Sequence, residues 1–275
     1  MGTFFRQLPT LIRKEQLQND YLAVVKIGIA LSGGGARGIA HIGVLKALEE
    51  MGVEIAVISG TSAGSIVASL YAQGLKPDQI FQLVAQLSLR KSVRPAWSMA
   101  GLFTMDGVRD LILKNIPGNN FSTLKIPLTI AATDLRKGEA VYFNSGELAT
   151  AVVSSCSIPV VFNPVSLNGN VYADGGLLDN LPARCIRHQC DFLIGSHCNE
   201  ISKEFDPKNF KNIIERSLLI AIYANTQQSK NLCNLSIAPP NMDRFTVFDI
   251  GKAKEIFEAG YQFTKSNFIR EHFQK

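Results

Sequence analysis

The sequence predicts a single α/β domain built around a mainly parallel β-sheet. Two observations concern the order of elements: an apolar run of strand length is followed at once by a glycine-rich turn and a helical pattern, and the same order then occurs a second time. Strands that alternate with helices in this way are typical of parallel sheets. The third observation is that no linker rich in Pro, Gly or Ser divides the 275 residues, a length that one domain can fill.

The N-terminal third supplies the two strand–turn–helix units. Residues 24–31, VVKIGIAL, form an apolar run of strand length, and the helical pattern after them ends at Gly52, a common helix terminator. The second unit pairs a strand over 55–59 with a helix from about 65 to 73. Pro77 then opens a further helix.

The remaining chain alternates shorter strands and helices. Asn168-Gly169 is a hairpin signal, because Asn-Gly favours the turn that joins antiparallel neighbours. We expect helices over 106–114, 147–155, 209–228 and 252–268. We expect strands over 128–133, 140–143, 160–166, 170–173, 191–196 and 245–249.

Composition indicates a globular, mildly basic protein. The chain is 46% hydrophobic and 19% charged, with a mean hydropathy of +0.11, which excludes a disordered or fibrous chain. The longest apolar stretch, 218–224, is far shorter than the roughly 18 to 20 residues of a membrane span. The N-terminus also lacks the apolar run of a secretory signal. The net charge of +5 suits a solvated surface or attraction to an anionic partner, and we expect no nucleic-acid binding.

The five cysteines are scattered and form no CxxC pair. Zinc sites need tighter, repeated spacing, so we expect no bound metal, and we expect no cofactor. Reduced thiols are the usual state in the cytoplasm, where we expect the protein to reside.

The first candidate site is a glycine-rich turn between the first strand and the first helix. It consists of Gly33, Gly34, Gly35, Ala36, Arg37 and Gly38. Glycines allow a sharp turn, and free N–H groups at a helix N-terminus attract negative charge. Such a loop serves either a dinucleotide pyrophosphate or the oxyanion of an acyl transfer. A dinucleotide site also needs an acidic residue at the end of the next strand, whereas Glu54 lies at its start, which disfavours a nucleotide.

The second candidate site is the pentapeptide Gly60-Thr61-Ser62-Ala63-Gly64, which follows the second strand. The pattern GxSxG between a strand and a helix is typical of a nucleophile elbow. The tight turn needs small residues at Gly60 and Gly64, and it exposes the hydroxyl of Ser62 at its apex. We therefore expect Ser62 to be a nucleophile.

A serine hydroxyl needs a base, and the spacing leaves that base open. An α/β-hydrolase triad in the order serine, acid, histidine is formally met by Ser62, Asp174 and His188 or His197. Of the other two histidines, His41 and His272, the first lies on an apolar helical pattern, where a histidine is more often packed in the core than a base.

Asp174-Gly175-Gly176 is the third motif. Alone it is a common turn, but GGGARG, GTSAG and DGG in this order resemble the patatin-like phospholipase family. SCSIP, residues 155–159, and FNP, residues 162–164, resemble the block that precedes the family's aspartate. The resemblance covers roughly residues 26–196 and implies a three-layer α/β/α fold with a mainly parallel central sheet.

The resemblance also implies a function: a lipid acyl hydrolase that cleaves phospholipid or lysophospholipid esters. Ser62 would be the nucleophile and Asp174 its direct base, with no histidine between them. The backbone of Gly33, Gly34, Gly35 and Ala36, helped by Arg37, would form the oxyanion hole. The glycines that support the three motifs would be Gly38, Gly60, Gly64, Gly175 and Gly176.

On this basis the chain divides into an N-terminal extension over 1–22, a catalytic core over 23–200 and a C-terminal helical part over 201–275 that packs on the same domain. Residues 90–105 show no helical or strand periodicity of apolar residues, and they carry several basic residues beside Trp97. Both features favour a loop or lid. Peripheral contact with an anionic membrane through this segment is one hypothesis, and an ordinary packed loop is the other. A non-enzymatic alternative is a lipid-binding or regulatory module in which Ser62 and Asp174 catalyse no reaction.

Overall fold

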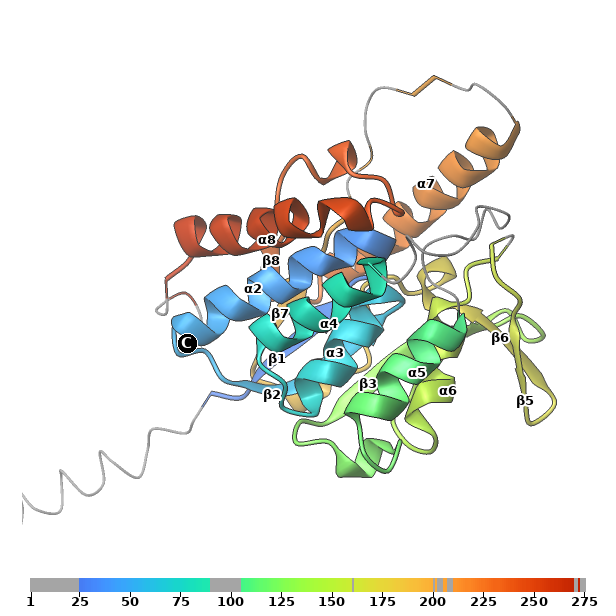
Figure 1. The fold of residues 1–275 in the computed structure, drawn as a ribbon, viewed down its shortest axis with the longest axis horizontal. Helices are drawn as coiled ribbons and strands as arrows, with labels where there is room; N and C mark the ends of the chain where they lie inside the picture. The colour runs from blue at the N-terminus through green and yellow to red at the C-terminus, as the bar shows by residue number, and fades with distance from the viewer. Residues whose placement is uncertain are drawn as a thin grey trace, which may run out of the picture.

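The structure is a computed structural model, and it describes residues 25–89, 105–159, 161–199, 201, 205–206, 210–269 and 272. The expected extension over 1–22 and all but the last residue of the 90–105 segment lie outside these residues. The described chain forms one mixed α/β domain in which helices pack around a single sheet (Figure 1).

Most helices and strands lie close to the positions expected from the sequence. The helices are α2 (Ile39–Glu50), α3 (Ala63–Ala72), α4 (Pro77–Leu89), α5 (Met105–Asn115), α6 (Leu148–Cys156), α7 (Phe210–Lys230) and α8 (Ala253–Asn267). The strands are β1 (Ile27–Leu31), β2 (Ile55–Thr61), β3 (Leu128–Asp134), β4 (Glu139–Phe143), β5 (Val165–Leu167), β6 (Asn170–Asp174), β7 (Phe192–Ser196) and β8 (Leu235–Ile237).

One sheet organises the domain, with the strand order β5-β6-β3-β2-β1-β7-β8 and with β4 on the second edge of β3. The neighbours from β3 to β8 in this order pair in parallel, so the mainly parallel sheet is confirmed. The strands β4, β5 and β6 pair antiparallel. From β1 the chain passes to β2 and β3 on one side and later to β7 and β8 on the other. The winding direction therefore reverses between β1 and β7.

The two faces of the sheet are covered differently. Ile29 and Leu31 of β1 belong to the main core, together with apolar residues of α2, α3, α6 and α8. Ala30 and Val57 belong to a smaller cluster, which the segment after the third motif and the chain just beyond α7 complete. Apolar residues on both faces of β1 are what a central parallel strand requires.

The strand expected over 245–249 is wrong. These residues lie between two short 3-10 helices, Met242–Arg244 and Ile250–Lys252, and the last strand of the sheet is β8. The apolar pattern that suggested a strand instead reflects loop packing, because Phe245 is fully buried whereas Phe248 is exposed.

The strand expected over 160–166 is shortened to β5. The carbonyl of Ile158 accepts hydrogen bonds from the N–H groups of Val161 and Phe162, at 3.2 and 2.9 Å, so the chain turns here before it can pair.

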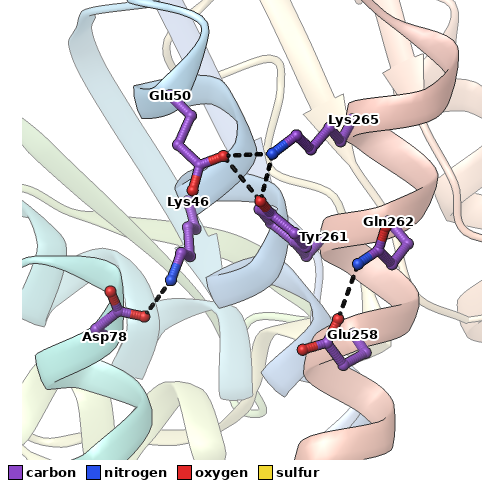
Figure 2. Close-up of polar contacts among 7 residues, drawn as sticks. All are labelled: Lys46, Glu50, Asp78, Glu258, Tyr261, Gln262 and Lys265. Atoms are coloured by element: carbon purple, nitrogen blue, oxygen red, sulfur yellow. Dashed lines mark hydrogen bonds and ion pairs between the residues drawn. The ribbon is translucent and has the colours of Figure 1, made fainter.

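Two glycines bring α8 against α2, which lie side by side in Figure 1. A Cβ atom on Gly43 would overlap the carbonyl oxygen of Phe257, and one on Gly260 would overlap that of Ala40. At the exposed rim, Glu50 accepts hydrogen bonds from Tyr261 at 2.8 Å and from Lys265 at 3.0 Å (Figure 2). Exposed ion pairs of this kind contribute little stability, so the backbone approach is the main constraint.

Gly260→Ala is therefore expected to lower the free energy of unfolding by about 2 kcal/mol, because overpacking against a carbonyl outweighs the gain in helix propensity of about 1 kcal/mol. Urea unfolding measures this loss. Gly251→Ala is the matched control, since a Cβ at Gly251 would meet nothing within 4 Å. Equal stability of the two variants would contradict the close packing of α2 on α8.

Candidate active site

The register of β3 brings Ser62 and Asp174 together. Strand β2 pairs with β3 as far as Thr61 opposite Ala131. Strand β6 pairs with β3 from Asp174 opposite Ala132. Because β4 occupies the other edge of β3, β2 and β6 follow one another along the same edge. The residue after β2 and the last residue of β6 therefore meet end to end.

Ser62 has the strained backbone of a nucleophile elbow. Its φ is 52° and its ψ is −125°, a conformation that residues other than glycine rarely adopt. The turn is tight enough that a Cβ on Gly60 would lie 2.6 Å from the carbonyl oxygen of Gly64, and a Cβ on Gly64 would lie 2.5 Å from that of Leu31. The strain is maintained by packing of the turn between β1 and β2.

Ser155 fixes the elbow from the side, and sequence reasoning did not assign it this role. Its hydroxyl accepts a hydrogen bond from the N–H of Ser62 at 2.8 Å and donates one to the carbonyl of Ala131 at 2.6 Å. Ser155 begins the SCSIP block, so the motif contained the residue but not its function. The hydroxyl of Ser155 thus connects Ser62 to the β3 residue opposite Thr61.

Asp174 is a buried carboxylate with one unsatisfied oxygen. Its Oδ1 accepts a hydrogen bond from the N–H of Gly176 at 2.7 Å, whereas its Oδ2 has no hydrogen-bond partner among the described residues. Burial raises the pKa of Asp174 from 3.8 to about 6, and the neighbouring hydroxyl of Ser62 and the N–H of Gly176 lower it in part. The contact between the Ser62 hydroxyl and the Asp174 carboxylate therefore falls short of a well-formed hydrogen bond.

The N–H groups of the glycine-rich turn differ in whether they donate to another part of the described backbone. The N–H of Gly33 donates to the carbonyl of Asn180 at 3.1 Å, and that of Ala36 donates to the carbonyl of Val247 at 2.8 Å. The N–H of Arg37 donates within the turn, to the carbonyl of Gly34. Among the described residues, Gly34 and Gly35 have no backbone acceptor of this kind, which narrows the expected set of oxyanion donors.

The segment after Met242 holds the glycine-rich turn in place. The Nε–H of Arg37, a buried side chain, donates to the carbonyl of Phe245 at 2.7 Å. Gly35 has φ +56°, and a Cβ there would lie 2.5 Å from the carbonyl oxygen of Val247. Arg37 therefore packs as a bridge between the turn and the 245–247 segment.

Two asparagines join the loop of Asp174 to α7. Asn180 donates its N–H to Asn225 Oδ1 at 3.0 Å and its Nδ2–H to the Thr226 hydroxyl at 3.1 Å. Asn225 in turn donates to the carbonyl of Gly176 at 2.9 Å. Sequence reasoning missed both residues. The signal for Asn225 was a polar Asn-Thr pair at the end of an apolar helical run.

The other predicted glycines lie at close contacts. Gly38 faces Ala63, Gly175 faces the backbone of Ala131, and Gly176 faces the carboxylate of Asp174. All three motifs thus converge on the carboxyl edge of the parallel strands.

None of the four histidines makes a described hydrogen bond with Ser62 or Asp174. His41 bonds the Ser196 hydroxyl at 2.8 Å and the Ser32 carbonyl at 2.9 Å, and burial lowers its pKa to about 4. Burial also lowers the pKa of His197 to about 3, and its Nδ1 accepts a hydrogen bond from Asn199. Both rings are neutral structural groups at physiological pH.

Comparisons with known proteins connect this geometry to one family. The model of the family described as "Patatin-like phospholipase" matches residues 29–184. An "Uncharacterized NTE family protein Rv1063c" of Mycobacterium tuberculosis is 38% identical over 160 residues, covering 57% of this chain and 44% of that protein. "Lysophospholipase nte1" of Aspergillus fumigatus is 25% identical over 300 residues, covering 94% of this chain and 20% of that protein.

The chain thus spans less than half the length of these relatives. Among solved structures, VipD from Legionella pneumophila superposes on 88% of this chain and 67% of that chain, with a TM-score of 0.47 and 17% identity.

Asp174→Asn is expected to stabilise the protein near neutral pH. The folded-state pKa of about 6 lies above the ordinary 3.8, so the folded state holds this proton more tightly than the unfolded state. The protonated carboxyl contributes stability fully below the unfolded-state pKa, and this contribution is lost as the pH rises through about 6. The loss in the free energy of unfolding is on the order of 3 kcal/mol. Urea unfolding should show a gap between variant and wild type that grows from about pH 4 to about pH 6.

Asp110→Asn, at an exposed position of α5, is the matched control and should change stability by no more than about 0.5 kcal/mol. A gap for Asp174→Asn that does not vary with pH would contradict the buried, raised-pKa carboxyl.

Proposed function

The chain belongs to the patatin-like phospholipase family, and from this premise we propose that it hydrolyses fatty acyl esters of phospholipids or lysophospholipids through Ser62 and Asp174. One observation carries the proposal: a serine in a strained elbow lies against a buried carboxylate of raised pKa, and no hydrogen bond described in the structure joins a histidine to either. The name of the fungal relatives, lysophospholipase, supports the substrate class.

The reaction we propose has two steps. As Ser62 Oγ attacks the ester carbonyl carbon, its proton passes to Asp174. The tetrahedral intermediate then collapses, the alcohol leaves with that proton, and an acyl-Ser62 ester remains. In the second step a water molecule attacks this ester while Asp174 takes a proton from the water. The fatty acid then leaves as Asp174 returns that proton to Ser62 Oγ. A carboxylate with a pKa of about 6 is a stronger base than an ordinary one, which favours the first transfer.

The developing oxyanion needs fixed donors. We assign them to the N–H groups of Gly34 and Gly35, because those of Gly33 and Ala36 already donate to Asn180 and Val247. Two preorganised N–H groups in a buried site supply a large part of the acceleration in acyl transfer. In this proposal Arg37 holds the loop through the carbonyl of Phe245 rather than contacting the oxyanion through its Nε.

Peripheral contact with a membrane and a cytoplasmic location remain part of the proposal. In the part of the chain that the structure describes, no helix is long and apolar enough to cross a bilayer. The 90–105 segment, the expected lid, lies outside the described residues except for Met105.

Ser62→Ala is expected to reduce hydrolysis of a lysophospholipid and of a short-chain nitrophenyl ester to background. Asp174→Asn is expected to lower kcat by about 10²- to 10⁴-fold, the usual contribution of a general base. His188→Gln and Asp110→Asn are the controls, and both should retain activity. Measured kcat and KM for the wild type and these four variants decide between a base at Asp174 and a histidine triad. Full activity of Ser62→Ala would overturn the proposal, and a loss in His188→Gln equal to that in Asp174→Asn would favour a histidine triad.

A further inference from the structure

Two side chains hold one backbone carbonyl of the glycine-rich turn, that of Gly33. The Nδ2–H of Asn199 donates to this carbonyl at 2.7 Å, and the hydroxyl of Ser32 donates to it at 3.0 Å. Asn199 and Ser32 are both buried, so water does not compete for these bonds. A carbonyl oxygen has two lone pairs, and two donors on it fix the direction in which it points.

The direction of the Gly33 carbonyl decides where the N–H of Gly34 points. A trans peptide unit is planar, so its C=O and its N–H point in opposite directions. Because the carbonyl is directed at Asn199, the N–H of Gly34 is directed away from Asn199. The unit also lies against the nucleophile, since a Cβ on Gly33 would lie 3.1 Å from Ser62 Cβ.

The glycines of this turn make an outside support necessary. Residues 33–35 are consecutive glycines, and glycine adopts many backbone conformations at little cost. The N–H of Gly35 is oriented from within the turn, because the Gly34 carbonyl of the same peptide unit accepts the N–H of Arg37 at 3.2 Å. The N–H of Gly34 has no such internal device, and its direction depends on Asn199 and Ser32.

The chain after β7 forms a firm support for Asn199. The N–H of His197 donates to the carbonyl of Ile237 at 3.0 Å, which extends the pairing of β7 with β8. The N–H of Cys198 donates to the Ser32 hydroxyl at 3.2 Å, and that of Asn199 donates to His197 Nδ1 at 3.2 Å. Asn199 is thus fixed relative to the sheet.

The other half of the Asn199 amide shows that stability alone does not explain the residue. Its Oδ1 is buried without a hydrogen-bond partner among the described residues, and a Cβ on Gly34 would lie 2.9 Å from it. A buried oxygen without a donor costs free energy of folding. The useful atom of Asn199 is therefore Nδ2, the donor to Gly33.

We propose that Asn199 is a positioning residue of the oxyanion hole: by bonding the Gly33 carbonyl, it aims the N–H of Gly34 at the developing oxyanion. Asn199 itself does not touch the substrate. The inference rests on the proposed function, which assigns the oxyanion donors to Gly34 and Gly35, and it adds a residue that no motif of the sequence contains.

Steady-state kinetics of Asn199→Leu and Asn199→Ala test the proposal. Both variants lack the donor, and Asn199→Leu keeps the branched skeleton of the side chain, so the two differ in packing. For a lysophospholipid, kcat should fall at least about tenfold in both, and KM should change less than about threefold, because oxyanion donors act in the transition state.

Asn115→Ala is the matched control. The Nδ2–H of Asn115 also donates to a backbone carbonyl, that of Leu111 at 2.8 Å, but at the end of α5. This variant should keep the wild-type kcat and KM. Wild-type kcat in both Asn199 variants, with thermal unfolding showing an intact fold, would overturn the proposal, and so would a rise in KM at unchanged kcat.

A crystal structure of the wild type inhibited by a fluorophosphonate needs neither a variant nor turnover. The phosphonyl oxygen should accept the N–H of Gly34, while Asn199 still donates to the Gly33 carbonyl. A Gly34 N–H that points away from this oxygen, or an Asn199 amide bonded to the inhibitor, would overturn the proposal. If the wild type neither hydrolyses a lipid nor reacts with the inhibitor, the proposed function fails. Crystal structures of the wild type and Asn199→Leu then decide whether the amide fixes the Gly33–Gly34 peptide, and an unchanged peptide would refute its positioning role.

Discussion

The site depends on one structural constraint, the division of a single edge of β3 between two strands. The parallel strand β2 uses the edge up to Ala131, and the antiparallel strand β6 uses it from Ala132. The change of partner places the end of β2 against the end of β6. Ser155 reinforces this point by bonding both the N–H of Ser62 and the carbonyl of Ala131. Without the shared edge of β3, Asp174 would not lie against the turn at Ser62.

The arrangement of Ser62 beside Asp174 costs free energy of folding, and contacts with the surrounding structure maintain it. Ser62 adopts a positive φ, and Asp174 is ionised at neutral pH only against the cost of its burial. Asn225 holds the Gly176 carbonyl, and Asn180 joins the same loop to α7 and to Gly33. Backbone strain persists only where neighbouring contacts over-determine the conformation, and these contacts do so around Ser62.

Much of this arrangement follows from sequence. Neighbouring parallel strands end at the same edge of a sheet. The turns GGGARG and GTSAG, which follow two such strands, are therefore expected to lie side by side. The expected role of Asp174 came from a family resemblance, because DGG alone is an ordinary turn. Asn180 and Asn225 carried no motif, since their contacts form only when α7 packs against the loop of Asp174. The strand expected over 245–249 was wrong because Phe245 is buried by tertiary packing, and its carbonyl accepts a hydrogen bond from Arg37 and not from a neighbouring strand.

The central claim is that Asp174 alone activates Ser62, and the rate at which a fluorophosphonate labels Ser62 tests it most directly. Mass spectrometry of the labelled peptide identifies the serine, and the labelling rate is followed from pH 4 to pH 8. The account predicts a rate that rises with an apparent pKa of about 6 in wild type and in His188→Gln, and a slow rate that does not vary with pH in Asp174→Asn. An unchanged profile in Asp174→Asn, or labelling at a serine other than Ser62, would contradict it.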